Sequence, residues 1–383
     1  MTFNRTQVIY ALAMALLFGP LAITWWSNAP RSFEFSQDPV SVTGDPVYHE
    51  QFISFVEGKN VAAHASSATM RRDGKILVAW YTGTEEGARD VEISSAIIDP
   101  ETYTLSPSLT AATRLQTEKD TWRYIRKLGN PLVYQLADGR AVLLYVSVSF
   151  GGWAVSNLNL RFSDDGGLTW SPAQRIVTSP FLNLSTLVKG TPTKLTNGEV
   201  GIPVYHEFLG KFGELLVVDV NGKVKNKHRM SWGREAIQPV IVPVTKDKAV
   251  ALLRDSGEEQ KRVAITTSSD SGQSWAPLSH LELANPNSAV AAIQSYQGNL
   301  LLVFNNDEDE RNNLSLATSM NNGKTWKVIH EFENQPLEPG KKIKFSYPYL
   351  IKGNNNDYHL FYTWRKSRIK YIHFNEAWLK GRL

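Results

Sequence analysis

One eight-residue motif occurs three times in this chain and restricts the folds that the chain can adopt. Its pattern is Ser-x-Asp/Asn-x-Gly-x-x-Trp, and the copies SDDGGLTW, SSDSGQSW and SMNNGKTW begin at Ser163, Ser268 and Ser319. The starts are separated by about two units and about one unit of roughly 50 residues, a period typical of the blades of a β-propeller. The repeat therefore predicts a set of similar β-sheets arranged around an axis.

The motif acts locally. Its Asp or Asn side chain can accept hydrogen bonds from backbone N–H groups of its own turn, and its glycine can adopt the positive φ that such a turn needs. Its tryptophan covers the blade with a large apolar ring. The motif thus predicts a peripheral hairpin and says little about chemistry.

The rest of the chain is rich in predicted strands. Short apolar runs bounded by Gly, Asn, Asp or Pro recur along it, for example KILVAWYTG, GRAVLLYVSV, GELLVVDV and NLLLVFNN. Runs of this length and composition are typical of strands, and no long helical period follows residue 27. About 330 residues at about 50–57 residues per unit predict an all-β, six-bladed β-propeller.

Composition excludes several classes of site. The chain has 42% hydrophobic and 20% charged residues, which is typical of a globular protein. It has no cysteine, which excludes disulfides, thiolate metal sites and a cysteine nucleophile. Its net charge of +4 is small and dispersed, so we predict no nucleic-acid partner.

The N-terminus contains a candidate membrane anchor. Residues 8–26 read VIYALAMALLFGPLAITWW and carry no charge, which is close to the ~20 residues that cross a bilayer as a helix. Arg5 precedes the run and Trp25-Trp26 end it, as an interfacial belt would. A cleaved signal peptide is the alternative, but Pro30 after Ser27-Asn28-Ala29 disfavours cleavage.

These features predict three regions. Residues 1–29 are a signal anchor, 30–55 a tether and lead-in, and 56–383 the propeller. The positive residue before the apolar run places the propeller outside the cytoplasm, in the periplasm or at the cell surface. The membrane is then a partner through the N-terminal helix.

The repeats resemble the Asp-boxes, or BNR repeats, of the sialidase superfamily. The chain is similar to the bacterial predicted neuraminidases of that superfamily over nearly all of residues 60–375. The resemblance also rests on further landmarks: Gly129-Asn130-Pro131, Lys189-Gly190-Thr191-Pro192, AIQPVIV, LLRDSG, NPNSAV, ERNNLSLATS and FSYPYLI. It implies a six-bladed propeller with its active site at the mouth of the central channel.

The resemblance also implies roles for individual residues. Sialidases hold the substrate carboxylate with arginines, protonate with an Asp, and attack with a Tyr that a Glu activates. Asp90 fits the acid/base position, Glu235 the activating carboxylate and Tyr347 the nucleophile, while Arg254 and Arg311 fit the arginine cluster. A neutral phenol suits a sugar that carries a carboxylate at its reacting carbon, because an anionic nucleophile would be repelled there.

One position departs from the family pattern. The first clamp arginine of sialidases lies in an Arg-Ile-Pro step, whereas this chain reads Ala-His-Ala-Ser-Ser, with His64 at or beside the missing arginine. Arg126 could supply the missing charge, as could its neighbours Arg123 and Lys127. We therefore assign His64 and Arg126 to substrate binding.

The remaining histidines predict no metal site. His64, His206 and His373 are scattered in the sequence, and no metal-ligand motif is present. The sequence predicts neither a metal nor another cofactor.

Three functions remain open. The leading hypothesis is a sialidase-like, exo-acting glycoside hydrolase of an acidic sugar in a glycan or extracellular polysaccharide. The second is a polysaccharide lyase acting on a uronate, which would use an arginine with His64 and Tyr347. The third is a non-catalytic carbohydrate-binding or assembly propeller, because the same fold binds ligands without chemistry.

Overall fold

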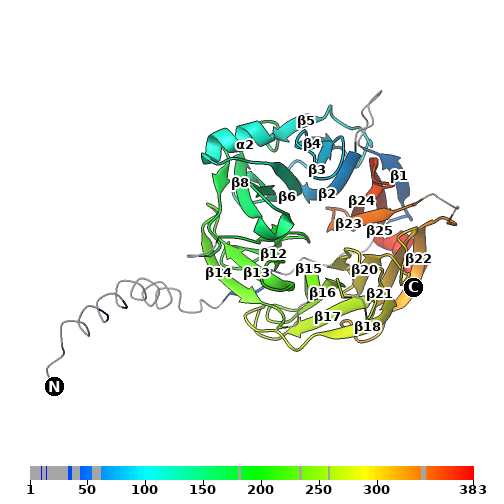
Figure 1. Cartoon of the computed structure of the whole chain (residues 1–383). Helices are drawn as coiled ribbons and strands as arrows, with labels where there is room; N and C mark the ends of the chain where they lie inside the picture. The colour runs from blue at the N-terminus through cyan, green and yellow to red at the C-terminus, as the bar shows by residue number, and fades with distance from the viewer. Residues whose placement is uncertain are drawn as a thin grey trace, which may run out of the picture.

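The structure is a computed structural model that describes Tyr10, Met14 and residues 33–36, 44–53, 62–179, 183–232, 235–257, 259–337 and 342–383. Its strands form six antiparallel sheets, which stand around a central channel as the blades of a propeller (Figure 1). The predicted six-bladed, all-β fold is confirmed.

The first three blades run from the channel outward in chain order. Their strands are β2 (Ala62–Met70), β3 (Ile76–Gly83), β4 (Glu92–Ile98) and β5 (Leu109–Ala112); β6 (Lys127–Gln135), β7 (Ala141–Val148), β8 (Asn157–Ser163) and β9 (Gln174–Arg175); and β10 (Leu187–Val188), β11 (Thr193–Lys194), β12 (Val200–His206), β13 (Phe212–Val218) and β14 (Val224–Arg229). In the third blade, β10 and β11 both pair with β12, so the inner strand is divided in two.

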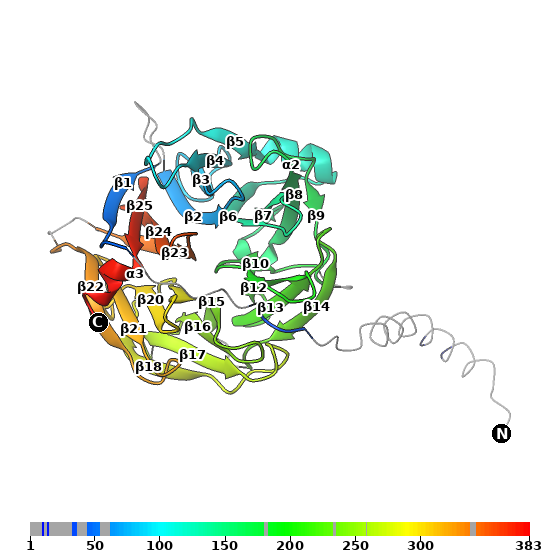
Figure 2. The same cartoon turned by 180° about the vertical axis from the view of Figure 1, so that it is seen from behind.

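The last three blades complete the ring. Their strands are β15 (Ala236–Pro243), β16 (Ala249–Asp255), β17 (Arg262–Ser268) and β18 (Ser279–Ala284); β19 (Ala291–Gln294), β20 (Leu300–Phe304), β21 (Asn313–Ser319) and β22 (Lys327–Asn334); and β23 (Phe345–Lys352), β24 (Asp357–Trp364), β25 (Arg368–Asn375) and β1 (Tyr48–Phe52). The N-terminal β1 is thus the outer strand of the last blade, where it pairs with β25. Figure 2 shows this joint of blue and red strands from behind.

The segment predicted as a tether and lead-in takes part in the propeller. Besides β1, it contains Phe35, which is fully buried and forms a bridge with Leu195 of the third blade. The Phe35 N–H also donates to the Lys246 carbonyl of the fourth blade at 2.8 Å. The described part of 30–55 therefore ties the N-terminal region to two separate places on the ring.

Helices are few and short in the described part of the chain. They are α2 (Arg114–Thr121), the 3-10 turn η1 (Trp153–Val155) and α3 (Glu376–Lys380). None of the described helices is long and apolar enough to span a bilayer. The predicted anchor at 8–26 lies outside the described residues except for Tyr10 and Met14, and it stays a prediction.

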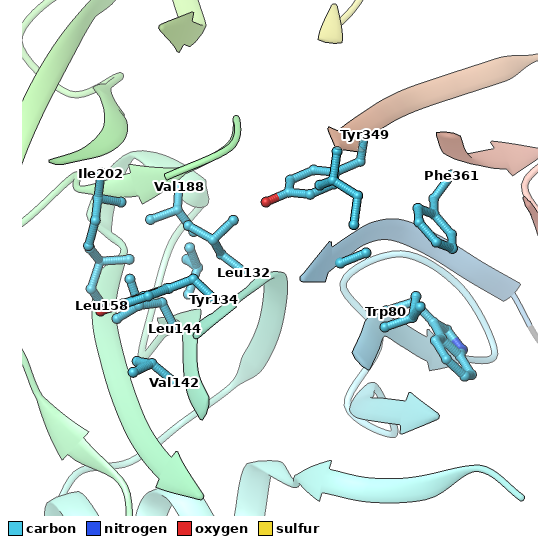
Figure 3. Close-up of a cluster of buried hydrophobic side chains, with 14 of the residues drawn as sticks. Trp80, Leu132, Tyr134, Val142, Leu144, Leu158, Val188, Ile202, Tyr349 and Phe361 are labelled. Carbon is cyan, nitrogen blue, oxygen red and sulfur yellow. The ribbon is translucent and has the colours of Figure 1, made fainter. Parts of the chain in front are cut away.

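Apolar side chains fill the spaces between neighbouring blades. In Figure 3, Tyr349 and Phe361 of the sixth blade lie near Trp80 of the first, and Leu132 and Leu144 of the second lie near Val188 and Ile202 of the third. All of these side chains belong to one buried cluster. This burial holds the blades in a ring, because each sheet covers an apolar face of the next.

The three repeated motifs occupy equivalent places, as predicted. Each motif begins with the last residue of the third strand of its blade, and the serine hydroxyl accepts the N–H of the motif glycine at 2.7–2.9 Å. In the first copy, Asp165 Oδ1 accepts the N–H groups of Leu168 and Thr169 at 3.0 and 2.9 Å. The tryptophans pack on three different clusters between blades; they are Trp170, Trp275 and Trp326.

A backbone irregularity interrupts the inner strand of most blades. The pairing between first and second strands shifts register within β2, β6, β15 and β23, and in each case one residue of the shift has a positive φ. Gly190 (φ 101°) lies in the gap between β10 and β11, and Asn287 (φ 52°) lies just before β19. The four residues in the register shifts are Ala65, Asn130, Gln238 and Tyr347.

Proline reinforces this irregularity. A proline directly follows the positive-φ residue in β6, β15 and β23. Because proline has no N–H, it suits a position where the ladder lacks a hydrogen bond. Such β-bulges redirect side chains and are common beside functional sites.

We predict that Gly190→Ala destabilises the protein strongly. A Cβ on Gly190 would lie 2.4 Å from the Pro239 carbonyl oxygen, in addition to the cost of its positive φ. We expect a loss of about 3–5 kcal/mol in the free energy of unfolding, measured by urea denaturation. The control is Gly198→Ala, where φ is 82° but no atom lies within 4 Å of the new Cβ; it should cost only about 1–2 kcal/mol. Equal losses in both variants would refute the role of this close approach.

Candidate functional site

Tyr347 stands at the bulge of β23 with a φ of 53°. A left-handed backbone is rare for an aromatic residue and costs of order 1–3 kcal/mol, so it persists only where the surroundings impose it. The ring is half-buried, and the hydroxyl makes no hydrogen bond within the described part of the chain. The residue predicted as the nucleophile is therefore rigidly placed with a free hydroxyl.

His64 lies edge-on against Tyr347, with ring centroids 4.7 Å apart. It comes from β2 of the first blade, next to β23 of the sixth, and it is 5% exposed. Its Nδ1 lies 2.9 Å from the Thr363 hydroxyl, which also accepts the Ala65 N–H at 3.0 Å. His64, which the sequence analysis assigned to substrate binding, therefore directly contacts Tyr347, the predicted nucleophile.

His64 is neutral at physiological pH. Burial, followed by the nearby cations Lys366, Arg311 and Lys189, lowers its pKa to about 3. Because Thr363 is placed to donate its hydroxyl proton to Nδ1, the arrangement favours a proton on Nε2. Nε2 points to the side of Glu86, whose Oε2 is 3.8 Å away.

The two predicted clamp arginines meet at one residue. Arg254 Nε donates to Asn287 Oδ1 at 2.6 Å, and Arg311 donates to the backbone carbonyl of Asn287. Both guanidinium groups are partly buried. Burial and then the proximity of Arg254 lower the pKa of Arg311, while Tyr347 and Glu86 oppose this shift. Arg311 therefore lies within electrostatic reach of both Arg254 and Tyr347.

Amide side chains from the bulges form a polar belt beside the arginines. Gln238 accepts from Arg254 NH1 at 3.1 Å and donates to the Tyr205 hydroxyl at 3.2 Å. Asn130 donates to the same hydroxyl at 3.1 Å. With Asn287, these contacts connect the bulge residues of three blades and fix the orientation of Arg254.

Lys189 is a site residue to which the sequence analysis gave no role. Its side chain is buried, donates to the Pro348 carbonyl at 3.2 Å, and lies 5.7 Å from the centre of the Tyr347 ring. Burial lowers its pKa to about 7. The sequence signal was the Lys-Gly-Thr-Pro landmark, whose glycine lies in the break of the inner strand.

The loop after β3 contributes a different carboxylate from the predicted one. Both carboxylate oxygens of Asp90 are engaged by Thr84, through its N–H and its hydroxyl at 3.0 Å each. Asp90 therefore closes the loop. Glu86, at the tip of the same loop, is the carboxylate that lies beside His64. The sequence could not separate the two, because a short acidic loop does not reveal which side chain faces inward.

Glu235 is not bonded to Tyr347. Its side chain is exposed and lies beside Gly257, where a Cβ would be 2.3 Å from Glu235 Oε2. Its carbonyl accepts the N–H and hydroxyl of Ser256, both at 2.6 Å. The direct hydrogen bond to the phenol that the family resemblance implies is absent among the described residues.

Arg126 also stays apart from the cluster. It is exposed, and its side chain makes no hydrogen bond or ion pair within the described residues. The ammonium group of the neighbouring Lys127 lies 4.0 Å from the centre of the Trp153 ring. Burial and then the charge of Arg126 lower the pKa of Lys127, and Glu86 partly opposes this shift. Lys127 is thus the cation of this segment that is closer to Glu86.

The histidines outside the mouth are not all scattered. His206 stacks on Phe212 and accepts the Leu209 N–H. His373, however, lies close to Asp357 and His359. Each of the three offers one atom that could bind a metal, and these atoms lie within 4.8 Å of one another. The pairing of β24 with β25 brings these residues together, although they are separated in the sequence.

Comparisons with known proteins agree with the fold. The BNR repeat-like domain family matches residues 74–360. A protein of unknown function from Dyadobacter fermentans has a TM-score of 0.67 at 15% identity, over 85% of this chain and 97% of its own. The Hadza microbial sialidase Hz136 has a TM-score of 0.67 at 16% identity, over 84% of this chain and 66% of its own.

A third similar structure is the leech intramolecular trans-sialidase complexed with 2,7-anhydro-Neu5Ac. Its TM-score is 0.65 at 13% identity, over 84% of this chain and 69% of its own. No curated protein matches the chain. Because the family model matches about three quarters of the chain, the chain belongs to the BNR repeat-like domain family, and it shares its propeller fold with these sialidases.

Proposed function

We propose that the mouth of the channel binds an acidic sugar and that the chain is a glycoside hydrolase of sialidase type. The observation that carries this proposal is the excess of positive charge around Tyr347. Two arginines and two lysines, against two carboxylates, lie within electrostatic reach of Tyr347 or of its neighbours His64, Tyr205 and Arg311; the cations are Arg254, Arg311, Lys189 and Lys366, and the anions are Glu86 and Glu207. A partly buried site with this balance favours an anionic ligand.

The arginines supply the recognition step. Guanidinium groups match a carboxylate geometrically and stay charged at every relevant pH. Because Asn287 and Gln238 already hold Arg254, and Asn287 also holds Arg311, little side-chain freedom is lost when substrate binds. Preorganised groups of this kind bind more tightly than free ones.

Tyr347 supplies the nucleophile in this proposal. Its phenol oxygen forms a bond to the anomeric carbon while the bond to the leaving oxygen breaks; water then attacks the same carbon, the bond to the phenol oxygen breaks, and the free sugar leaves. The phenol proton must pass to a base, and a proton must reach the leaving oxygen. In this proposal Glu235 takes the phenol proton through bridging water, and Glu86, beside His64, delivers a proton to the leaving oxygen.

A lyase is the second candidate, and the His64–Tyr347 pair favours it. In an elimination, a base removes the proton beside the uronate carboxylate, the bond to the leaving oxygen breaks, and a double bond forms between the two ring carbons. A neutral imidazole next to a phenol can act as base and acid in such a reaction. The contact at 4.7 Å supports this candidate, whereas the low pKa of His64 makes its imidazole a weak base.

We predict that Tyr347→Phe abolishes turnover without loss of binding. The full chain is incubated with sialylated and uronate-containing oligosaccharides, and the products are weighed by mass spectrometry. We expect addition of water to the products, and a kcat lower by about 10²–10⁴-fold in the variant with KM nearly unchanged. The control is Tyr48→Phe, a partly exposed tyrosine on the outer β1. Unsaturated products would contradict the hydrolase and support the lyase. If glycans bind but stay unchanged, the chain is a binding protein.

We predict that Arg254→Ala weakens binding of substrates that carry a carboxylate. Loss of a hydrogen bond to a charged group costs about 1.5–3 kcal/mol, which raises KM by about 10–150-fold. The methyl ester of the same substrate should lose much less. Arg140→Ala, an exposed arginine paired with Asp138, should change neither. If the Arg254→Ala variant loses the same affinity for the methyl ester as for the free acid, Arg254 acts only by holding Asn287 and Gln238.

We further propose that residues 8–26 anchor the propeller on the outer side of a membrane. The uncharged run and Pro30 after the small residues support an uncleaved helix. On fractionation, we expect the full chain in the alkali-washed membrane pellet and open to protease added to spheroplasts. A chain without residues 1–29 should be soluble. Recovery of a soluble form that begins at Pro30 would contradict the anchor.

A further inference from the structure

We propose that Asp357, His359 and His373 bind a divalent transition metal, with Zn²⁺ as the expected ion. Two imidazoles and one carboxylate are a ligand set that zinc accepts, with a remaining position for water. The site is separate from the mouth, because His359 and the His64 partner Thr363 lie near opposite ends of β24. The inference does not depend on the proposed function.

The strand pairing fixes the ligands on one face of the sixth blade. His359 of β24 is directly opposite His373 of β25, and opposite residues of an antiparallel pair point to the same face. Asp357 precedes His359 by two residues and therefore shares that face. The two imidazole rings lie with centroids 4.8 Å apart.

Each histidine is oriented by a tyrosine through its other nitrogen. The Tyr371 hydroxyl lies 3.0 Å from His359 Nδ1, and the Tyr103 hydroxyl lies 3.0 Å from His373 Nδ1. Both Nε2 atoms are therefore left for one common ligand. A second partner on the far nitrogen is the usual way in which proteins orient a metal-binding histidine.

The Nε2 atom of His373 is buried and faces Asp357 without a hydrogen bond among the described residues. His373 is 5% exposed, and within the described residues its Nε2 makes no hydrogen bond. It lies 3.3 Å from Asp357 Oδ2, about the separation of two ligand atoms on a tetrahedral zinc with bonds of about 2.0 Å. A buried nitrogen without a hydrogen bond needs an explanation, and a metal supplies one.

A glycine leaves room next to the other imidazole. A Cβ on Gly353 would lie 2.5 Å from His359 Nε2 and 3.0 Å from Asp357 Cβ. The space between the three ligand atoms is therefore bordered by backbone on this side. Tyr103 belongs to the turn after β4 of the first blade, so a metal here would reinforce the joint between the first and last blades.

Metal binding to the whole chain tests this site. Purified protein without an affinity tag is stripped with a chelator, titrated with ZnSO₄ by calorimetry, and substituted with Co²⁺ for visible spectroscopy. We expect one equivalent of zinc, a higher Tm with zinc, and a cobalt spectrum of four- or five-coordinate nitrogen and oxygen ligands. Absence of zinc uptake by the wild-type chain would overturn the proposal, leaving a simple Asp–His ion pair.

Variants identify the ligands. His373→Gln and Asp357→Asn should lose the equivalent of zinc and the zinc-dependent rise in Tm. Tyr103→Phe keeps all three ligands and should weaken zinc binding by about 10–100-fold. His280→Gln is the matched control, because His280 also faces an aspartate, Asp255 at 3.1 Å, but belongs to no such cluster among the described residues. Zinc retained equally in every variant would place the ion elsewhere and refute the site.

Discussion

The irregular inner strands of most blades are the constraint on which the mouth of this propeller depends. A regular ladder would alternate side chains between the two faces of a sheet. In β2, β6, β15 and β23 the ladder shifts register, and one residue in each shift adopts a positive φ. Tyr347 and Gln238 are two of these residues, and they lie within the same polar cluster around the arginines. The site is built from departures from ideal β-structure, which the packing between blades stabilises.

Charge and burial act together at this site. Lys189 and His64 are buried and carry lowered pKa values of about 7 and about 3. His64 is therefore neutral near physiological pH and Lys189 is divided between its charged and neutral forms, unlike ordinary surface lysines, while the arginines keep their charge. The mouth thus combines permanent cations for binding with neutral groups that can exchange protons. This combination supports the proposed acidic-sugar substrate, and Tyr347 contacts His64 and lies near Lys189.

The two ends of the propeller have different chemistry. The mouth is rich in arginine, lysine and amide groups, whereas the Asp357, His359 and His373 cluster lies near the other end of β24. The latter stands where β1 closes the ring against β25. Ring closure by strand pairing and side-chain contacts from Tyr103 join the first and last blades at the same place. The contacts that close the ring thus lie near one end of β24, and the candidate functional site lies near the other end.

The sequence by itself determined the repeat, the number of blades and several residues of the mouth. Local hydrogen bonds produce the three Ser-x-Asp/Asn-x-Gly-x-x-Trp turns, so their spacing could be read directly. Arg254, Arg311, Tyr347 and His64 were predicted from the resemblance of their flanking motifs to a known family, and the structure brings them close together. Only the tertiary structure decided that Glu86 faces His64 while Asp90 closes its loop, that Glu235 makes no bond to Tyr347, and that Lys189 is buried beside it. The physical reason is that these outcomes depend on side-chain direction and on contacts between blades, which a one-dimensional pattern does not contain.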